Sequence, residues 1–142
     1  MEIWKQVAIN DLCRFNYLRN SIESMRQQIE NINARLVGSG YCMGNTPVQG
    51  GGSQIEDKYN NGIVLKDKLE NQIKQNEKDY MLIKSAFEKL SKDEQKILNY
   101  AYINRSHKYI EIISETFNVE TAQAYRYVNA ALQKYIMVRY GV

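Results

Sequence analysis

The chain has 142 residues, of which 19 are basic and 16 acidic, and a net charge of +3. Its first residues include Glu2 and Asp11 rather than a long apolar core, so we expect no signal peptide, and no stretch approaches the roughly 18 apolar residues of a membrane span. Two cysteines, Cys13 and Cys42, match no metal or disulfide pattern, and a soluble protein of a reducing cytoplasm is therefore expected.

The residues that break helices are concentrated in one short segment. The only proline is Pro47, and six of the eight glycines lie between Gly38 and Gly52. Because proline and glycine disfavour helix interiors, this distribution predicts an all-α chain with two helical blocks around a flexible loop, residues 38–52. We do not expect this loop to bind phosphate, because no Gly-Lys-Ser/Thr motif follows its glycines and both flanking segments are predicted to be helical.

A heptad pattern runs through the first block. Its apolar residues recur at alternating spacings of four and three, with polar residues between them, as in the seam of a coiled coil. We expect one helix over residues 2–37. The seam consists of Leu18, Ile22, Met25, Ile29, Ile32 and Leu36. The same spacing extends towards the N-terminus through Phe15, Asp11, Ala8 and Trp4, of which only Asp11 is not apolar.

The second block repeats the same spacing less regularly. Its apolar seam residues are Leu69, Ile73, Tyr80 and Ile83, while Gly62, Lys66 and Asn76 interrupt the pattern. A buried Asn76 would fix the register of a helix pair at some cost in stability. The alternative, which we favour, is that Lys66 and Asn76 face water where the two helices diverge.

Two blocks of similar length joined by one loop predict a long, coiled-coil-like antiparallel helical hairpin over residues 1–89. Two helices alone cannot bury both faces of a seam well. A homodimer with a four-helix arrangement would solve this, so we expect the hairpin to oligomerise. Packing of the hairpin against the C-terminal residues is the competing solution.

Residues 90–142 form a second domain of shorter predicted helices. Ser91 and Glu94 have the spacing of a capping box, and a helix follows to about residue 103. A second helix covers residues 107–117, and Asn118 tolerates the left-handed conformation of a tight turn. Val119 fills the corner before a last helix at residues 120–140. The expected core is Ile97, Leu98, Ala101, Ile110, Ile113, Phe117, Ala124, Val128, Ala131, Leu132 and Tyr135.

The stretch LSKDEQKILNYAYINRSHKYIEIISETFNVETAQAYRYVNAALQKY resembles region four of bacterial sigma factors and related phage regulators. Both have a leading Leu-Ser/Thr-x-x-Glu, an apolar face on the second helix, a short turn and a helix close to VYRxIxxAL, here Ala124 to Leu132. Asn118 replaces the usual glycine, and Glu120 replaces the usual Ser/Thr cap. The layout of the whole chain resembles that of RinA/ArpU-type phage late-gene regulators.

The resemblance implies a helix-turn-helix that binds double-stranded DNA, in a phage-type regulator that activates late genes in the bacterial host cytoplasm. The last helix would enter the major groove with its N-terminal residues on base edges. The expected base-reading residues are Thr121, Ala122, Gln123, Tyr125, Arg126 and Asn129. The expected phosphate contacts are Arg105, His107, Lys108 and Lys134.

The net positive charge of the C-terminal domain is low for a domain that binds DNA. Residues 91–142 contain seven basic and five acidic residues, a net charge of +2. We therefore expect two copies to bind two half-sites as a homodimer. Host RNA polymerase is a further candidate partner.

Catalysis is not expected, because the chain shows no nucleophile with a base and no pair of carboxylates in apolar surroundings. His107 is the only histidine, so no catalytic residue, metal site or cofactor is predicted. Two other functions remain open. One is a protein-interaction module, such as a phage-encoded inhibitor or a factor that binds RNA polymerase. The other is a small terminase-like DNA-packaging component.

Overall fold

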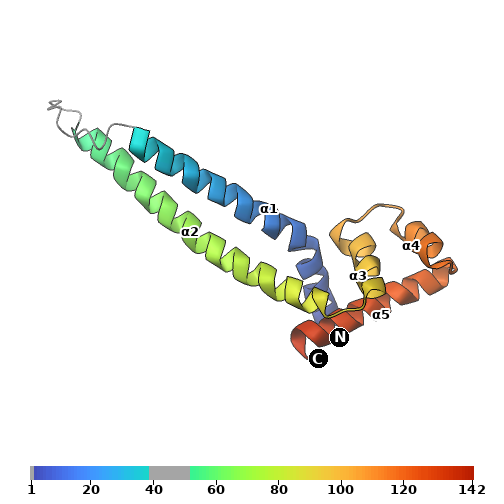
Figure 1. Ribbon diagram of the computed structural model, residues 1–142. Coiled ribbons are helices and arrows are strands. Elements are labelled where there is room, and N and C mark those ends of the chain that lie inside the picture. Colours follow the sequence, from blue (N-terminus) through green and yellow to red (C-terminus); the bar gives the residue numbers. More distant parts are fainter. Residues whose placement is uncertain (1, 39–51) are drawn as a thin grey trace. The chain divides into compact units, whose positions relative to one another are not determined.

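The computed structural model describes residues 2–38 and 52–142, and within this part it contains helices and no strand. The expected all-α class is confirmed. The elements are α1 (Glu2–Gly38), α2 (Gly52–Glu88), α3 (Lys92–Leu98), the π-helix η2 (Asn99–Ile103), α4 (Tyr109–Phe117) and α5 (Thr121–Tyr140), as Figure 1 shows. Most of the predicted loop, residues 39–51 with Cys42 and Pro47, lies outside the described residues.

Contacts divide the chain into two compact units. Unit 1 comprises Met1–Arg19 and Lys78–Val142, and unit 2 comprises Asn20–Glu77. Unit 1 thus unites the start of α1 and the end of α2 with the C-terminal helices. That residues 90–142 act as a DNA-binding domain of their own stays a prediction.

Unit 2 is a pair of antiparallel helices, formed by the later part of α1 and the earlier part of α2 (Figure 1). Ser21 contacts Asn76, whereas Leu36 packs on Gly62, so the two helices run in opposite directions. Four predicted seam residues of this unit are buried: Ile22, Met25, Ile32 and Ile73. Three others are half-buried: Ile29, Leu36 and Leu69. Pairing of the two helices within one chain therefore buries much of the predicted seam.

Asn76 is buried in this pair, with only 7% of its surface exposed, so the expectation that it faces water is wrong. Its amide donates to Ser21 Oγ at 3.1 Å and its Oδ1 accepts from Gln72 Nε2 at 2.9 Å. These partners lower the cost of burying a polar amide. Arg26 and Glu77 form an ion pair between the two helices close by, and Lys66 is half-buried.

The core of unit 1 lies between the C-terminal helices and the ends of α1 and α2. Every predicted core residue of the C-terminal helices is buried except Phe117, which is half-buried and packs against the core. The other buried members of this core are Ala8, Leu12, Leu18, Ile83, Ala86, Leu90 and Ile136. The half-buried Tyr80 stacks on Phe15 with ring centroids 4.9 Å apart. Unit 1 therefore buries part of the predicted seam, through Leu18, Tyr80 and Ile83. Packing of the hairpin against the C-terminal residues was the alternative to oligomerisation considered above.

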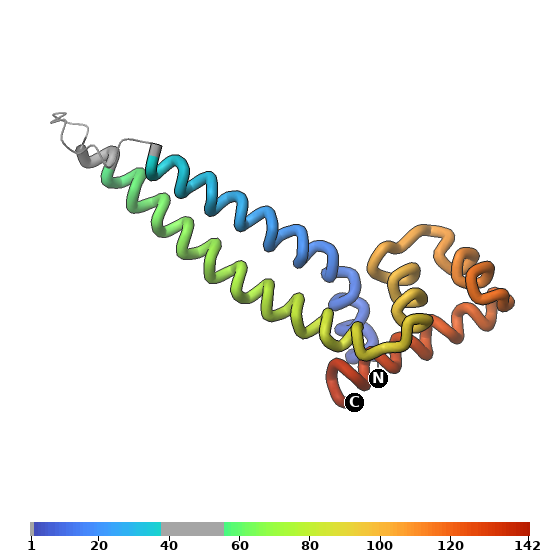
Figure 2. Tube along the Cα trace, viewed as in Figure 1, coloured from blue at the N-terminus to red at the C-terminus, as the bar shows by residue number. Residues whose placement is uncertain are grey.

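Asp11, the polar residue in the predicted seam, is buried against α5. Its carboxylate accepts hydrogen bonds from the hydroxyls of Tyr135, at 3.2 Å, and Tyr140, and it lies 3.6 Å from Arg139 Nε. Burial, and then the Asp11 carboxylate, raise the pKa of both phenols, which therefore remain protonated donors. The Trp4 ring lies 5.2 Å from that of Tyr140, and the two chain ends lie side by side in Figure 2.

Candidate functional site

The turn between α4 and α5 has the predicted left-handed residue. Asn118 has φ 52° and ψ 53°, and Val119 N–H donates to Ser114 O at 3.0 Å, as in a Schellman motif. The Ser114 hydroxyl also donates to the carbonyl of Val119, and the half-buried Val119 packs against the core. These contacts hold the start of α5 against the end of α4.

The start of α5 lacks the usual polar cap. Glu120 occupies the N-cap position with extended backbone angles, and its side chain makes no capping hydrogen bond. Ser, Thr, Asn and Asp are the residues that cap a helix best. The exposed Glu120 carboxylate adds a negative charge beside the end where the helix dipole attracts anions.

The predicted base-reading residues lie on the first half of α5, and all but one are exposed. The half-buried Gln123 accepts a hydrogen bond from Arg126 Nη1 at 3.4 Å. The exposed members are Thr121, Ala122, Tyr125, Arg126 and Asn129. Ala122, Arg126 and Asn129 share one face, because residues spaced three and four apart are neighbours on a helix. The opposite face is buried through Ala124 and Val128.

Three of the four predicted phosphate contacts lie in segment 105–108, before α4, and all four are exposed. The Arg105 guanidinium lies over the Tyr109 ring, 4.7 Å from its centroid. Lys108 N–H donates to Ser106 Oγ at 3.3 Å. His107 lies between them, and Lys134 lies two turns beyond Arg126 on α5.

Charge on this surface is mixed. Helix α5 contains three basic residues and no carboxylate, and one of the three, Arg139, faces Asp11. Glu111, Glu115 and Glu120 are exposed on α4 and the turn. Since α4 and the turn add negative charge, the basic surface is limited to Arg126, Lys134 and segment 105–108.

Two features of this region gave no signal in the sequence. The first is η2, whose last turn is closed by a hydrogen bond from Asn104 N–H to Asn99 O at 2.8 Å. The second is Asn16 of α1, whose amide donates to Ile103 O at 3.3 Å and to Asn104 Oδ1 at 2.9 Å. An asparagine on a helix surface shows no partner in its local pattern, so long-range pairing of this kind is invisible in the sequence.

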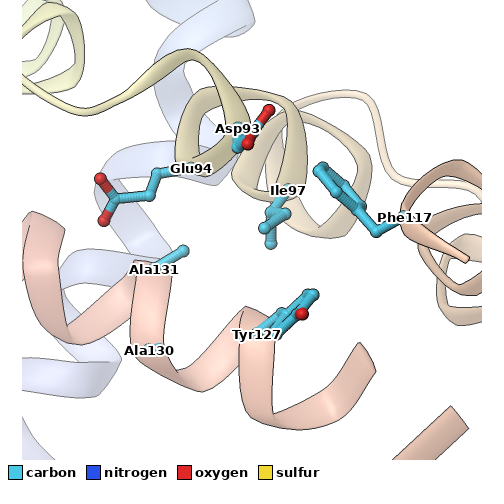
Figure 3. A pocket seen from close by; sticks show the side chains of 7 residues that line it. All are labelled: Asp93, Glu94, Ile97, Phe117, Tyr127, Ala130 and Ala131. Carbon is cyan, nitrogen blue, oxygen red and sulfur yellow. The ribbon is translucent and has the colours of Figure 1, made fainter. Parts of the chain in front are cut away.

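A shallow groove of about 270 Å³ lies between α3 and α5. Figure 3 shows Tyr127 pointing toward Ile97 and Phe117, with the two carboxylates on α3 at the rim. The lining residues are Asp93, Glu94, Ile97, Phe117, Tyr127, Ala130 and Ala131. One Glu94 oxygen accepts the Ser91 N–H, which completes the predicted capping box.

Within residues 2–38 and 52–142, no three His, Cys, Asp or Glu side chains are placed to hold a metal ion. None of the helices described is long and apolar enough to cross a membrane. Cys13 is a free, exposed cysteine.

Comparison with known proteins gives one family. The model of the family described as Protein of unknown function (DUF1492) matches residues 36–135, well over half of the chain. No curated protein and no solved structure matches the chain.

Proposed function

The chain belongs to the family Protein of unknown function (DUF1492), and we propose that it is a sequence-specific DNA-binding transcription regulator. In this proposal α4 and α5 are a helix-turn-helix similar to sigma region four, and α5 is the recognition helix. The observation that carries it is the exposed polar face of α5 after the left-handed turn at Asn118. The resemblance to RinA/ArpU-type regulators extends it to a phage-type activator of late genes.

The side chains on this face suit base recognition. An arginine such as Arg126 can make two hydrogen bonds to guanine, and Asn129 can make two to adenine. Gln123, which accepts a hydrogen bond from Arg126, would hold that guanidinium in place as well as approach a base. Segment 105–108 and Lys134 would contact phosphates, which position the protein without reading sequence.

A homodimer is part of the proposal, because the limited positive charge favours binding to two half-sites. Helix pairing within one chain already buries seam residues of unit 2. The contacts between two copies in a dimer would therefore use other side chains. Val37, Val64 and Leu65 are large apolar residues exposed on the helices of unit 2. Sedimentation measurements on the purified chain give its mass directly, and a strictly monomeric chain at micromolar concentration would exclude this part of the proposal.

The test is selection of bound sequences from random duplex DNA, followed by titration of the enriched site. Arg126→Ala should weaken binding to that site by about 1–3 kcal/mol and relax preference at one base pair. Arg35→Ala is the matched control, because Arg35 is exposed near the end of α1 and its loss removes the same charge.

Both variants should retain the helicity of the parent chain, since each replaces an exposed side chain within a helix. If selection enriches no sequence, DNA recognition is wrong. If Arg126→Ala binds the site as tightly as Arg35→Ala, α5 is not the recognition helix.

The groove between α3 and α5 favours a second candidate function, a protein-interaction module that binds RNA polymerase. Its floor is apolar at Ile97 and Ala131, and its rim has the Asp93 carboxylate. This candidate predicts no retention on DNA at low salt and a stable complex with purified bacterial RNA polymerase. Asp93→Ala, which removes the rim carboxylate on α3 and leaves α5 unchanged, should weaken that complex.

A further inference from the structure

The two residues just before the segment that is proposed to contact phosphate form hydrogen bonds with α1, a helix far away in sequence. Asn16 Nδ2 donates to Ile103 O at 3.3 Å, the last residue of η2, and to Asn104 Oδ1 at 2.9 Å. Asn104 Nδ2 in turn donates to Asn99 Oδ1 at 2.7 Å. Three asparagines thus join α1, the body of η2 and the residue that precedes Arg105.

From this geometry we propose that Asn16 is a positioning residue for DNA binding. It touches no DNA but sets the position of segment 105–108, and so of the Arg105 and Lys108 charges. The inference rests on the proposed function, because it assigns phosphate contact to that segment.

The two ends of the segment are held by different contacts. At its end, Lys108 N–H donates to Ser106 Oγ at 3.3 Å and Tyr109 N–H donates to Ser106 O at 3.1 Å, while Lys108 O accepts from Ile112 N–H at 3.1 Å. These bonds shape the turn and join its end to α4. At its start, the two bonds from Asn16 attach the two preceding residues, Ile103 and Asn104, to α1, in which Leu12 and Leu18 are fully buried.

The bond from Asn16 to Ile103 also provides a partner for a carbonyl group at the end of η2. The last carbonyls of a helix have no partner within the helix, and Ile103 O receives one from Asn16. Arg19 Nη2 donates to Asn16 Oδ1 at 3.3 Å, which orients the amide so that its nitrogen faces segment 103–104. Asn16→Ala would remove the connection and leave α1 helical, because alanine is the best helix former.

The first measurement is the affinity of the full chain for its selected DNA site, by fluorescence anisotropy. Asn16→Ala should weaken binding about three- to tenfold, the equivalent of one or two lost hydrogen bonds. Asn20→Ala is the matched control, since Asn20 is an exposed asparagine one turn further along α1. It should bind as the parent does.

A second background separates positioning from general stability. When Arg105→Ala and Lys108→Ala are already present, Asn16→Ala should cost no further affinity, because the charges that it positions are gone. An equal loss in both backgrounds would show that Asn16 acts on the fold as a whole, and would overturn the proposal. No loss in the parent background would overturn it as well.

A third readout needs no DNA. In Asn16→Ala, hydrogen exchange at the amides of Lys108 and Tyr109 should accelerate, while exchange at the buried turns of α5 stays unchanged. Unchanged exchange at both amides would overturn the positioning role. If the parent chain binds no DNA but exchange changes as described, the proposed function has failed and the anchoring of the segment stands.

Discussion

The hydroxyl of Tyr135 in α5 donates a hydrogen bond to the carboxylate of Asp11 in α1 at 3.2 Å, and the two residues are 124 positions apart in sequence. Neither residue is more than 8% exposed. Asp11 also faces Arg139, whose Nε is buried and makes no hydrogen bond. The carboxylate therefore accepts from two tyrosine hydroxyls and pairs with one arginine where α1 meets α5.

Replacement of Asp11 by alanine should lower the free energy of unfolding by about 2–4 kcal/mol, because the buried Tyr135 hydroxyl loses its acceptor and Arg139 loses its ion-pair partner. Urea unfolding followed by circular dichroism measures this loss. Glu23→Ala, an exposed carboxylate on the same helix, should change stability by less than about 0.5 kcal/mol. Equal effects of the two substitutions would contradict the role given to Asp11.

Alkaline pH should also destabilise the chain through Tyr135. Its pKa is raised above the ordinary value of 10.0, by burial first and by Asp11 next. The folded state thus holds this proton more tightly than the unfolded state. The stabilisation is complete below pH 10.0 and is lost as the pH rises above it.

The slope should approach about 1.4 kcal/mol per pH unit for this one phenol. Urea unfolding at a series of pH values, with Tyr135→Phe beside the parent, isolates its share. The variant should be less stable than the parent at neutral pH and should lose less stability above pH 10.0. Parallel curves for the two proteins would refute this assignment.

Gly62 offers a stabilising substitution in unit 2. A Cβ there would lie 3.2 Å from Leu36 Cδ2, the flexible end of a half-buried side chain, which can shift by a few tenths of an ångström. Alanine is favoured over glycine within a helix by about 1 kcal/mol, so Gly62→Ala should raise stability by up to that amount. Gly62→Val, which adds branches toward Leu36 and Ile32, should lower it. A lower melting temperature for Gly62→Ala would show that Leu36 cannot move.

Glu120→Ser should strengthen the start of α5. Serine can accept a hydrogen bond from the first turn, which glutamate does not do here, and such a cap contributes about 1 kcal/mol. Removal of the carboxylate should also tighten DNA binding under the proposed function. Glu111→Ser also removes an exposed carboxylate from the start of a helix but adds no cap, so it should not raise the melting temperature. A Glu120→Ser protein no more stable than Glu111→Ser would argue against the missing cap.

Lys108→Ala tests the phosphate contact. The substitution should weaken binding to all DNA sequences alike and reduce the slope of log affinity against log salt by about 1. Lys68→Ala, an exposed lysine of unit 2, should leave the slope at its parent value. If Lys108→Ala changes sequence preference instead, Lys108 contacts a base rather than a phosphate.

Local signals in the sequence predicted much of the fold. The capping box of Ser91 and Glu94 and the left-handed Asn118 depend on residues a few positions apart, and both were predicted. The heptad spacing likewise predicted six buried residues of α1 and α2, namely Leu18, Ile22, Met25, Ile32, Ile73 and Ile83. Trp4, which the extended seam included, is exposed. In each case the pattern and the structure that it forms lie within a few turns of one helix.

Long-range pairing was not predictable in the same way. Asp11 interrupts the heptad pattern, but nothing near it indicates Tyr135 as its partner, and the burial of Asn76 was wrongly predicted because Ser21 lies on another helix. For the candidate site, periodicity predicted which face of α5 is exposed. What that face binds came from a resemblance, and it stays a prediction.

Unit 1 combines the start of α1 with residues 78–142, and this arrangement has a consequence for folding. Ala8 and Leu12 leave the ribosome long before the α5 residues of the same core, so this apolar stripe of α1 lacks its α5 partners until that helix has been synthesised. Pairing of the unit 2 helices, closed at one end by Ser21 and Asn76, would shorten the loop that must close to bring residues 2–19 to residues 78–142. We expect that pair to form first. In pulsed hydrogen exchange during refolding, protection in unit 2 should precede protection in α5, and the reverse order would refute this sequence of events.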